Sequence, residues 1–222
     1  MNNRRLTIDF YVFLKMLAAN NNREWFMEHK NEFEKYVFMP FKRLTEEVIF
    51  LMQRIDPAIH IIYKDAAFRF YRDIRFSQDK SPYKLWMGAV VNRIGRKNTR
   101  YPEVYFQFGP GENFIAVGLY RPDKETLFKI RKKIAAQPDV FQHVNEDKLF
   151  RSFFPEGIQG EKNKRLPKEW MSVAEKQPLL YNKQFYAIKY FTTDEIVNAD
   201  LARLIVSHYQ AMHLFNDWLM DL

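Results

Sequence analysis

The sequence predicts an α+β fold in which a central, mainly antiparallel sheet of four or more strands is flanked by helices on both faces. Two observations lead to this fold class. Apolar residues recur at helical spacing near both ends of the chain, whereas residues 59–121 show the period of two that is typical of strands. No repeat and no clear linker divides the chain, so we expect a single domain over residues 1–222.

The first element is expected to be a helix. Its apolar residues follow the i, i+3, i+4, i+7 spacing of one helix face, namely Phe10, Phe13, Leu14 and Leu17. Thr7 or Asp9 is placed to cap its start, and three asparagines at 20–22 form the turn that ends it. The basic opening and the apolar stretch after it are similar to a secretory signal. Asp9 and Lys15 interrupt that stretch, however, and its periodicity favours a helix.

A second apolar stripe covers residues 26–55, which is longer than most globular helices. Pro40 lies inside this stripe, where a proline ring removes a backbone hydrogen bond. We therefore predict two consecutive helices or one kinked helix, closed by Asp56 and Pro57.

Four strands are predicted, at residues 86–92, 104–108, 114–120 and 185–191. The turn GPGEN at residues 109–113 joins the second and third of them as a hairpin. Both faces of these strands are largely apolar, which predicts that the sheet is covered on both sides.

The remaining elements are mostly helical. Asp123 begins a helix that breaks at Gln137 and Pro138, and a further short helical stretch reaches about Val144. Residues 154–168 are rich in Gly, Pro and Lys, and they predict a long loop. Thr193 is expected to cap one final helix whose apolar residues recur in steps of four and three to the end of the chain.

Composition excludes several classes of protein. The chain has no cysteine, which excludes disulfides, thiolate zinc sites and cysteine nucleophiles and is ordinary for the cytoplasm, where we place it. Neither GxGxxG nor GxxxxGK[ST] occurs among its few glycines, so we expect no cofactor. No stretch approaches the roughly 18 to 20 apolar residues of a membrane span, so no membrane partner is expected. A net charge of +8 is compatible with phosphate-rich partners.

The densest charge lies in residues 68–84, FRFYRDIRFSQDKSPYK. Two acids, Asp73 and Asp79, leave three positive charges unbalanced among five basic residues: Arg69, Arg72, Arg75, Lys80 and Lys84. Two positive charges about 4 Å apart repel by roughly 4 kcal/mol at an effective dielectric near 20. Close approach of these side chains therefore requires internal acids or an outside anion.

Two backbone geometries are open for this segment. If it is extended, Arg72 lies alone on an apolar face, where a guanidinium needs a carboxylate partner or a bound anion. If it is helical, Arg69, Arg72 and Arg75 form a basic stripe. Either geometry concentrates fork-shaped donors that suit carboxylates and phosphates.

The segment also has two main functional interpretations. In the structural one, Asp73 and Asp79, helped by acids elsewhere, pair with the cations and join strands to helices. In the functional one, the cations converge with the hydroxyls of the turn-forming residues 77–82 to form an anion-binding pocket. Its predicted residues are Arg69, Arg72, Arg75, Lys80, Tyr83 and Lys84. A surface patch without a role is the third alternative.

Two motifs, NNREWF at residues 21–26 and the segment 68–84, accompany the long helix with its central Pro40. With these features the chain resembles the bacterial and fungal domain of unknown function 2461 family over nearly its full length. The resemblance implies a single cytoplasmic α+β domain. It carries over no activity and no catalytic residue.

The histidines are weaker candidates. His29 and His208 lie on apolar helix faces, where a core histidine with a satisfied ring nitrogen is the simpler interpretation. His29 is nevertheless a supporting candidate, as the general base of a phosphoester hydrolase with Asp73 or Asp79 nearby. His213 and Asp217 share a helix face without a third ligand, so we expect no metal site.

Arg23 is a further supporting candidate, since it could reach the cationic cluster from the helix junction at residues 20–25. We predict that the cluster binds a small phosphate- or carboxylate-bearing ligand. The alternatives are a phosphoester-type hydrolase that uses the same residues and a non-catalytic structural, interaction or nucleic-acid-binding module. Nucleic acid ranks lower because the core needs most of the aromatic residues and the sheet is expected to be covered. Oligomeric state is not predicted.

Overall fold

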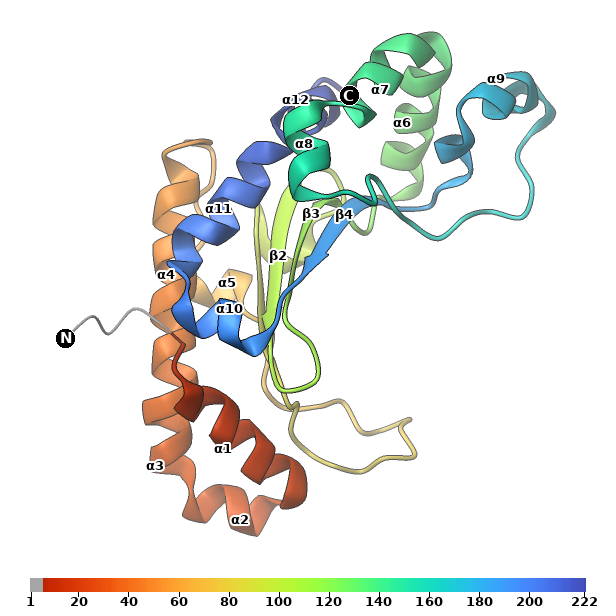
Figure 1. Cartoon of the computed structure of the whole chain (residues 1–222). Helices are drawn as coiled ribbons and strands as arrows, with labels where there is room; N and C mark the ends of the chain where they lie inside the picture. The colour runs from red at the N-terminus through yellow and green to blue at the C-terminus, as the bar shows by residue number, and fades with distance from the viewer. Residues whose placement is uncertain (1–5) are drawn as a thin grey trace. The chain divides into compact units, whose positions relative to one another are not determined.

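A computed structural model describes residues 6–222 (Figure 1). Residues 1–5, which include the basic start of the opening segment, lie outside the described residues. The chain divides into two compact units. Unit 1 contains the chain up to Arg96, Tyr105–Ile115 and Tyr190–Val206, and unit 2 contains Lys97–Val104, Ala116–Lys189 and Ser207–Leu222. A single domain over residues 1–222 stays a prediction.

The predicted fold class is confirmed, because helices surround an antiparallel four-stranded sheet of order β1-β2-β3-β4. The strands are β1 (Met87–Val91), β2 (Glu103–Phe108), β3 (Phe114–Leu119) and β4 (Phe185–Tyr190). Each lies within one residue, at either end, of the range that alternation predicted. The period-two pattern was therefore sufficient to find the strands.

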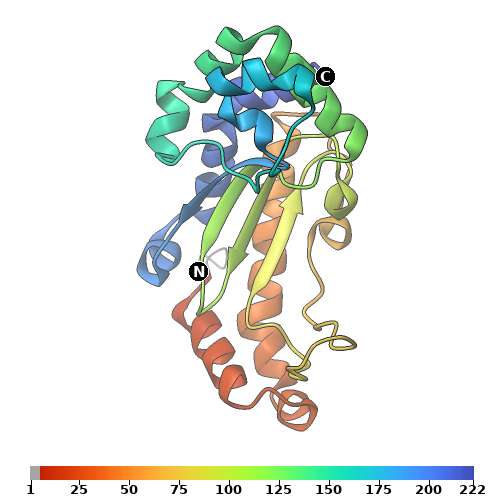
Figure 2. The same ribbon diagram turned by 90° about the vertical axis from the view of Figure 1, so that its right-hand side faces the viewer.

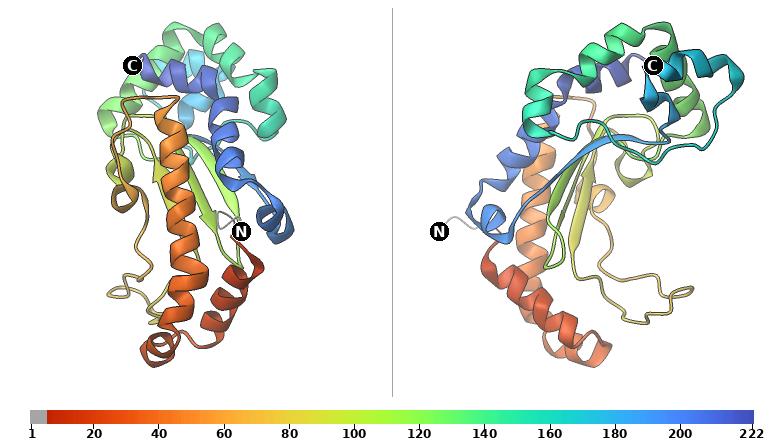
Figure 3. Two further views of the ribbon diagram at one scale, coloured as in Figure 1. Left: turned by 90° about the vertical axis from the view of Figure 1, so that its left-hand side faces the viewer. Right: turned by 45° about the vertical axis from the view of Figure 1, so that its right-hand side comes forward.

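Unit 1 begins with a run of helices beside the strands. They are α1 (Ile8–Ala19), α2 (Arg23–Glu28), α3 (Lys30–Glu32), a π-helical segment (Phe33–Phe38), α4 (Met39–Gln53) and α5 (Tyr63–Ala66). Figure 3 shows α4 lying along the strands of this unit. The unit also holds α10 (Thr193–Asn198) and the first residues of α11 (Leu201–Ala211).

The helix continues through Pro40 without a break. The segment before it, Phe33–Phe38, is π-helical, and α4 begins at Met39 with Pro40 in its first turn. Proline donates no backbone hydrogen bond, and its ring crowds the carbonyl four residues earlier. A wider π-helical turn relieves that crowding at the cost of local irregularity. The helix ends at Gln53, slightly before the predicted stop at Asp56.

The core of unit 1 lies between α4 and one face of the strands. Phe41 of α4 packs on Phe106 of β2, with 5.8 Å between ring centroids, and both side chains are fully buried. Residues of β2 alternate between buried and half-buried along the strand. In Figure 2 these strands face the viewer and α4 lies behind them. The half-buried residues, Tyr105 among them, therefore lie on the face away from α4.

Unit 2 is mainly helical. Its helices are α6 (Lys124–Ala136), α7 (Pro138–Asn145), α8 (Lys148–Phe153), α9 (Met171–Lys176) and α12 (His213–Met220). Short 3₁₀ turns occur in this unit at Lys168–Trp170 and Pro178–Tyr181, and a third, Gly95–Lys97, lies at the boundary with unit 1. The loop predicted at residues 154–168 contains no helix or strand up to residue 167, and Lys168 begins a 3₁₀ turn. Bridges Gln159–Tyr186 and Lys162–Asn182 attach this loop to β4 and to the segment before it.

The prediction of one final helix capped by Thr193 is wrong. The segment forms α10, α11 and α12, and its N-cap is Thr192, whose Oγ1 accepts a hydrogen bond from Glu195 N at 3.2 Å. Ala199 is extended after α10, and the Asp200 carboxylate then accepts from Arg203 N at 3.4 Å near the start of α11. The Asp200 carboxylate takes the place of a backbone carbonyl as acceptor for an amide at the start of a helix, which favours a new helix start at this point. Apolar spacing alone does not reveal such a start.

A helix cap in unit 2 provides a first prediction. Asp123 Oδ1 accepts a hydrogen bond from Thr126 N at 2.8 Å and so caps α6. We expect Asp123→Ala to lower the free energy of unfolding by about 1 kcal/mol in urea denaturation followed by circular dichroism. Asp123→Asn, which retains a capping oxygen, is expected to stay close to the wild type. Equal losses in the two variants would show that capping is not the role of Asp123.

Candidate anion-binding site

The basic segment, residues 67–84, is extended and forms an arm in unit 1. It pairs with β1 through the Ala67–Ala89 bridge and with itself through the Tyr71–Tyr83 bridge. Arg72 N donates to Pro82 O and Lys84 N donates to Phe70 O, both at 2.9 Å. Figures 1 and 3 show that this basic arm extends beyond the end of β1. The extended alternative is thus the one adopted, not the helical one.

Aromatic packing holds the base of the arm on the helices. The Phe70 ring lies 4.5 Å from that of Phe33, and the Tyr83 ring stacks on Phe26 with centroids 4.1 Å apart. Phe70 and Tyr83 are buried, whereas Phe76 at the tip is 95% exposed. The base of the arm is therefore part of the core, and its tip is not.

Two aspartates neutralise two of the arginines. Asp73 accepts from Arg75 in the bidentate manner, at 2.7 Å from Nη2 to Oδ2 and 3.0 Å from Nε to Oδ1. Arg72 Nη1 contacts Asp79 Oδ2, so the predicted need of Arg72 for a carboxylate is met within the arm. Asp79 Oδ1 accepts from Ser81 N at 2.9 Å and from Ser81 Oγ at 2.6 Å.

These contacts keep both carboxylates ionised. Hydrogen bonds from Ser81, and then from Arg72, hold the pKa of Asp79 well below its usual range. Hydrogen bonds from Arg75 lower the pKa of Asp73 to about 2. Neither group carries a proton near neutral pH, so neither is a general acid there. All four carboxylate oxygens already accept hydrogen bonds from the arm itself.

Lys84 has a different environment. Its ammonium lies 4.4 Å from the ring centroid of Trp86 and 5.7 Å from that of Phe68, and the residue is half-buried. Within residues 6–222, no carboxylate forms an ion pair with it. Burial lowers the pKa of Lys84, and the positive charges of Arg69 and Arg96 lower it further.

The other predicted cations lie at the surface. Lys80 Nζ donates to the carbonyl oxygen of Ile74 at 3.0 Å, and both Lys80 and Arg69 are exposed. Arg75 is exposed as well and is paired with Asp73. The predicted set thus divides into residues near Lys84 and residues that hold the tip of the arm.

A hollow of about 500 Å³ opens beside the arm, within unit 1. Five predicted residues line it, namely Arg72, Asp73, Asp79, Tyr83 and Lys84. The rest of the lining consists of Ala18, Asn21, Ser81, Leu85 and Trp86. Lys80, Arg75 and Arg69 are not in its lining. The structure therefore brings part of the predicted cluster together around a cavity.

Asn21 is a site residue that sequence reasoning treated only as part of a turn. Its Nδ2 donates to Tyr83 O at 3.0 Å, and its Oδ1 accepts from Tyr83 N at 3.1 Å. The side-chain amide therefore pairs with the arm as a neighbouring strand would. The NNREWF motif was a signal for this residue, since Asn21 is its first position.

The supporting candidates have other contacts. Burial raises the pKa of Tyr83, and the nearby positive charge of Arg23 partly offsets this rise. Arg23 therefore lies close to Tyr83. His29 Nδ1 lies 2.9 Å from Trp25 O, and its ring stacks on Trp25 with centroids 4.1 Å apart. Because a carbonyl only accepts, Nδ1 carries the hydrogen. A catalytic role of His29 stays a hypothesis, and no histidine lines the hollow in the described part of the chain.

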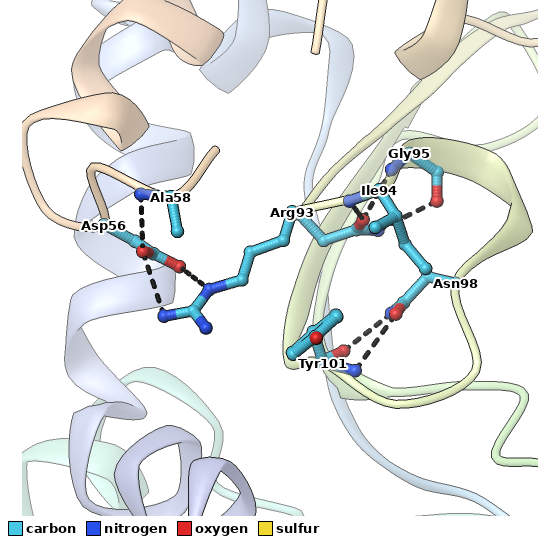
Figure 4. A network of polar contacts seen from close by, with 8 residues as sticks. Asp56, Ala58, Arg93, Ile94, Gly95, Asn98 and Tyr101 are labelled. Carbon is cyan, nitrogen blue, oxygen red and sulfur yellow. Dashed lines mark hydrogen bonds and ion pairs between the residues drawn. The ribbon is translucent and has the colours of Figure 1, made fainter. Parts of the chain in front are cut away.

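Two further polar side chains lie outside the lining of the hollow. Arg93 pairs with Asp56 in unit 1, at 2.7 Å from Nε to Oδ2 and 3.1 Å from Nη2 to Oδ1 (Figure 4). In unit 2, His208 is buried against the rings of Phe153 and Phe154. Residues 6–222 contain no group of three or more acidic, histidine or cysteine side chains that could hold a metal ion. None of their helices has the length and apolarity of a membrane span.

Comparison with known proteins supports the resemblance seen in the motifs. Residues 9–218 match the family described as "Conserved hypothetical protein (DUF2461)", and the chain belongs to that family. No curated protein and no solved structure matches the chain.

Proposed function

We propose that this member of the DUF2461 family binds a small phosphate- or carboxylate-bearing anion in the hollow beside the basic arm. The observation that carries the proposal is Lys84, a half-buried ammonium that lines the hollow without an ion pair in the described chain. Removing a charge from water is costly unless an opposite charge compensates it. A bound anion supplies that compensation.

The donors around Lys84 suit such a ligand. Arg72 lines the hollow, and its ion pair with Asp79 engages only one terminal nitrogen, Nη1. A guanidinium offers five donors in a planar fork, so Arg72 can bond Asp79 and a ligand oxygen together. The Asp73 and Asp79 oxygens are occupied by Arg75, Ser81 and Arg72, which reduces their repulsion of an anion.

The carboxylates that line the hollow offer no general acid for hydrolysis. Its two carboxylates have lowered pKa values and stay ionised, so they do not donate protons to a leaving group near neutral pH. We therefore propose a binding protein and not a phosphoester hydrolase. The cytoplasmic location predicted from the lack of cysteine is part of the same proposal, and cell fractionation tests it.

A thermal-shift experiment at low salt tests the proposal. The panel contains phosphate, pyrophosphate, nucleoside phosphates and citrate. At least one anion is expected to raise the melting temperature in proportion to the logarithm of its concentration. A panel in which no anion does so would exclude the proposed site.

The same experiment has a pH dependence with a defined sign. The anion binds protonated Lys84, whose pKa in the free protein is below its ordinary value. Affinity is therefore full below that pKa and falls as pH rises through it. In Lys84→Arg the guanidinium stays charged, so any remaining affinity for a panel anion whose own charge is constant between neutral and alkaline pH is expected to be flat there. A wild-type profile as flat as that of the variant would contradict the role of Lys84.

A further inference from the structure

A row of aromatic side chains crosses the sheet face of unit 1 that lies away from α4. Phe68 contacts Tyr105 at 5.7 Å between ring centroids, Tyr105 contacts Phe114 at 5.5 Å, and Phe114 contacts Tyr190 at 5.6 Å. We call these four residues, together with Trp86, the aromatic row. All of them belong to unit 1, and they come from the arm, from the residue before β1, and from β2, β3 and β4.

A glycine lets the rings on this face approach one another. A Cβ at Gly88 would lie 2.9 Å from the Tyr105 hydroxyl oxygen and 3.0 Å from Cζ3 of Trp86. Both rings therefore lie over the same position of β1, on the same face of the sheet. A side chain at residue 88 would separate Trp86 from Tyr105 and interrupt the row.

The aromatic row is accessible to a ligand. Tyr190 is 57% exposed, and the other four residues of the row are half-buried. In Figure 2, where α4 lies behind the strands, no helix of unit 1 lies in front of β1, β2 and β3. Within unit 1, the expected cover on the second face of the sheet, which ranked nucleic acid lower, is therefore not supplied by a helix. Aromatic rings that are needed only for a core are usually buried more completely. Phe106 and Phe108, which belong to β2 as Tyr105 does, are examples.

Positive charge gathers at the arm end of the row. The Lys84 ammonium lies over Trp86 and near Phe68, and Arg69 and Arg96 are close enough to lower its pKa. Arg96 donates to the carbonyl oxygens of Asp65 and Lys64 at 3.1 and 2.8 Å, so its contacts leave its charge unneutralised. Cations at one end of a row of rings match a ligand that alternates phosphates with flat bases.

From this arrangement we infer that the ligand is single-stranded nucleic acid, with a phosphate at Lys84 and bases stacked along the aromatic row. The inference rests on the proposed function, because the phosphate occupies the same hollow. Stacking on rings explains why the row continues to Tyr190, which a small anion in the hollow would not need. A neutral sugar would use the rings but not the three cations, and a duplex hides its bases from such rings.

Fluorescence anisotropy tests the inference with labelled oligonucleotides of about twelve nucleotides. The probes are single-stranded DNA, single-stranded RNA, the duplex, and an abasic strand that has the same number of phosphates and no bases. We expect a base-bearing single strand to bind at least about tenfold more tightly than the abasic strand. Binding is also expected to weaken steeply with salt.

Variants of the row separate stacking from charge. Tyr190→Ala is expected to weaken binding of the single strand by roughly five- to hundredfold and to leave the affinity for the abasic strand unchanged. Tyr105→Leu, which retains apolar volume, should behave alike. Phe50→Ala is the matched control, because Phe50 is 58% exposed but lies on α4. Melting curves of each variant show whether it is folded.

Three results would overturn the inference. The first is equal affinity for the abasic and the base-bearing strands, and the second is tighter binding of the duplex. The third is a melting-temperature rise with phosphate or pyrophosphate while no single strand binds, which leaves the anion site intact and removes only the nucleic-acid ligand. If neither inorganic anions nor strands bind, the proposed function fails together with the inference.

Discussion

Replacing Lys84 with methionine is expected to weaken anion binding by roughly ten- to hundredfold without loss of the fold. A hydrogen bond to a charged group contributes about 1.5 to 3 kcal/mol, which corresponds to this range of affinity. Methionine keeps the unbranched shape of the side chain and most of its length, and its sulfur and methyl group retain favourable contact with the rings of Trp86 and Phe68. The variant removes a charge that burial disfavours, so its melting temperature without ligand should equal or exceed that of the wild type.

Isothermal titration calorimetry with pyrophosphate measures this loss. Lys42→Met is the matched control, because it removes the same charge from α4, away from the lining of the hollow. Lys42 Nζ lies 3.8 Å from Glu46 Oε1, so this ammonium already has a carboxylate partner. The control is expected to bind as the wild type does. A Lys84→Met protein that is folded and binds with unchanged affinity would show that the anion does not contact Lys84, and the proposed function would then be wrong.

The second expected result concerns stability. Phe70→Ala should lower the free energy of unfolding by about 3 to 5 kcal/mol, the usual range for removing a buried phenylalanine. Phe70 is buried against Phe33, Phe26 and Tyr83, so the substitution leaves a cavity at the base of the basic arm. Anion binding should fall as well, since the Tyr83 ring stacks on Phe70 and Lys84 N donates to Phe70 O, and both Tyr83 and Lys84 line the hollow.

Phe76→Ala is the comparison within the same segment. Phe76 is 95% exposed, and its truncation is expected to change stability by no more than about 0.5 kcal/mol. Urea denaturation measures both variants under identical conditions. Similar losses for Phe70→Ala and Phe76→Ala would mean that the aromatic packing described for the base of the arm does not anchor it.

Local patterns were sufficient for most of the secondary structure. Alternation found β1 to β4 because a strand presents successive side chains to opposite faces, and this period is visible without tertiary contacts. The cap at Asp123 was visible for the same reason, since a cap acts within one helical turn. The break between α10 and α11 was missed because Asp200 competes with the backbone where the apolar spacing continues.

The candidate site shows where such patterns reach their limit. The sequence identified the excess of three positive charges in residues 68–84, because counting charge requires no coordinates. It could not assign the partners of those charges. Asp79 reaches Arg72 across a loop that folds back on itself, and Asn21 reaches Tyr83 from a different helix junction. Both contacts depend on distances that only the folded chain defines.

Composition and period thus established the strands, most of the helices and the concentration of charge, since each is a property of neighbouring residues. Tertiary structure alone decided that Arg72 and Arg75 are neutralised while Lys84 is not, and that Lys84 lies at the end of a partly exposed aromatic row. The physical reason is that ion pairing and burial depend on separations of a few ångströms between side chains, and the path of the folded backbone sets these separations even between residues close in the chain.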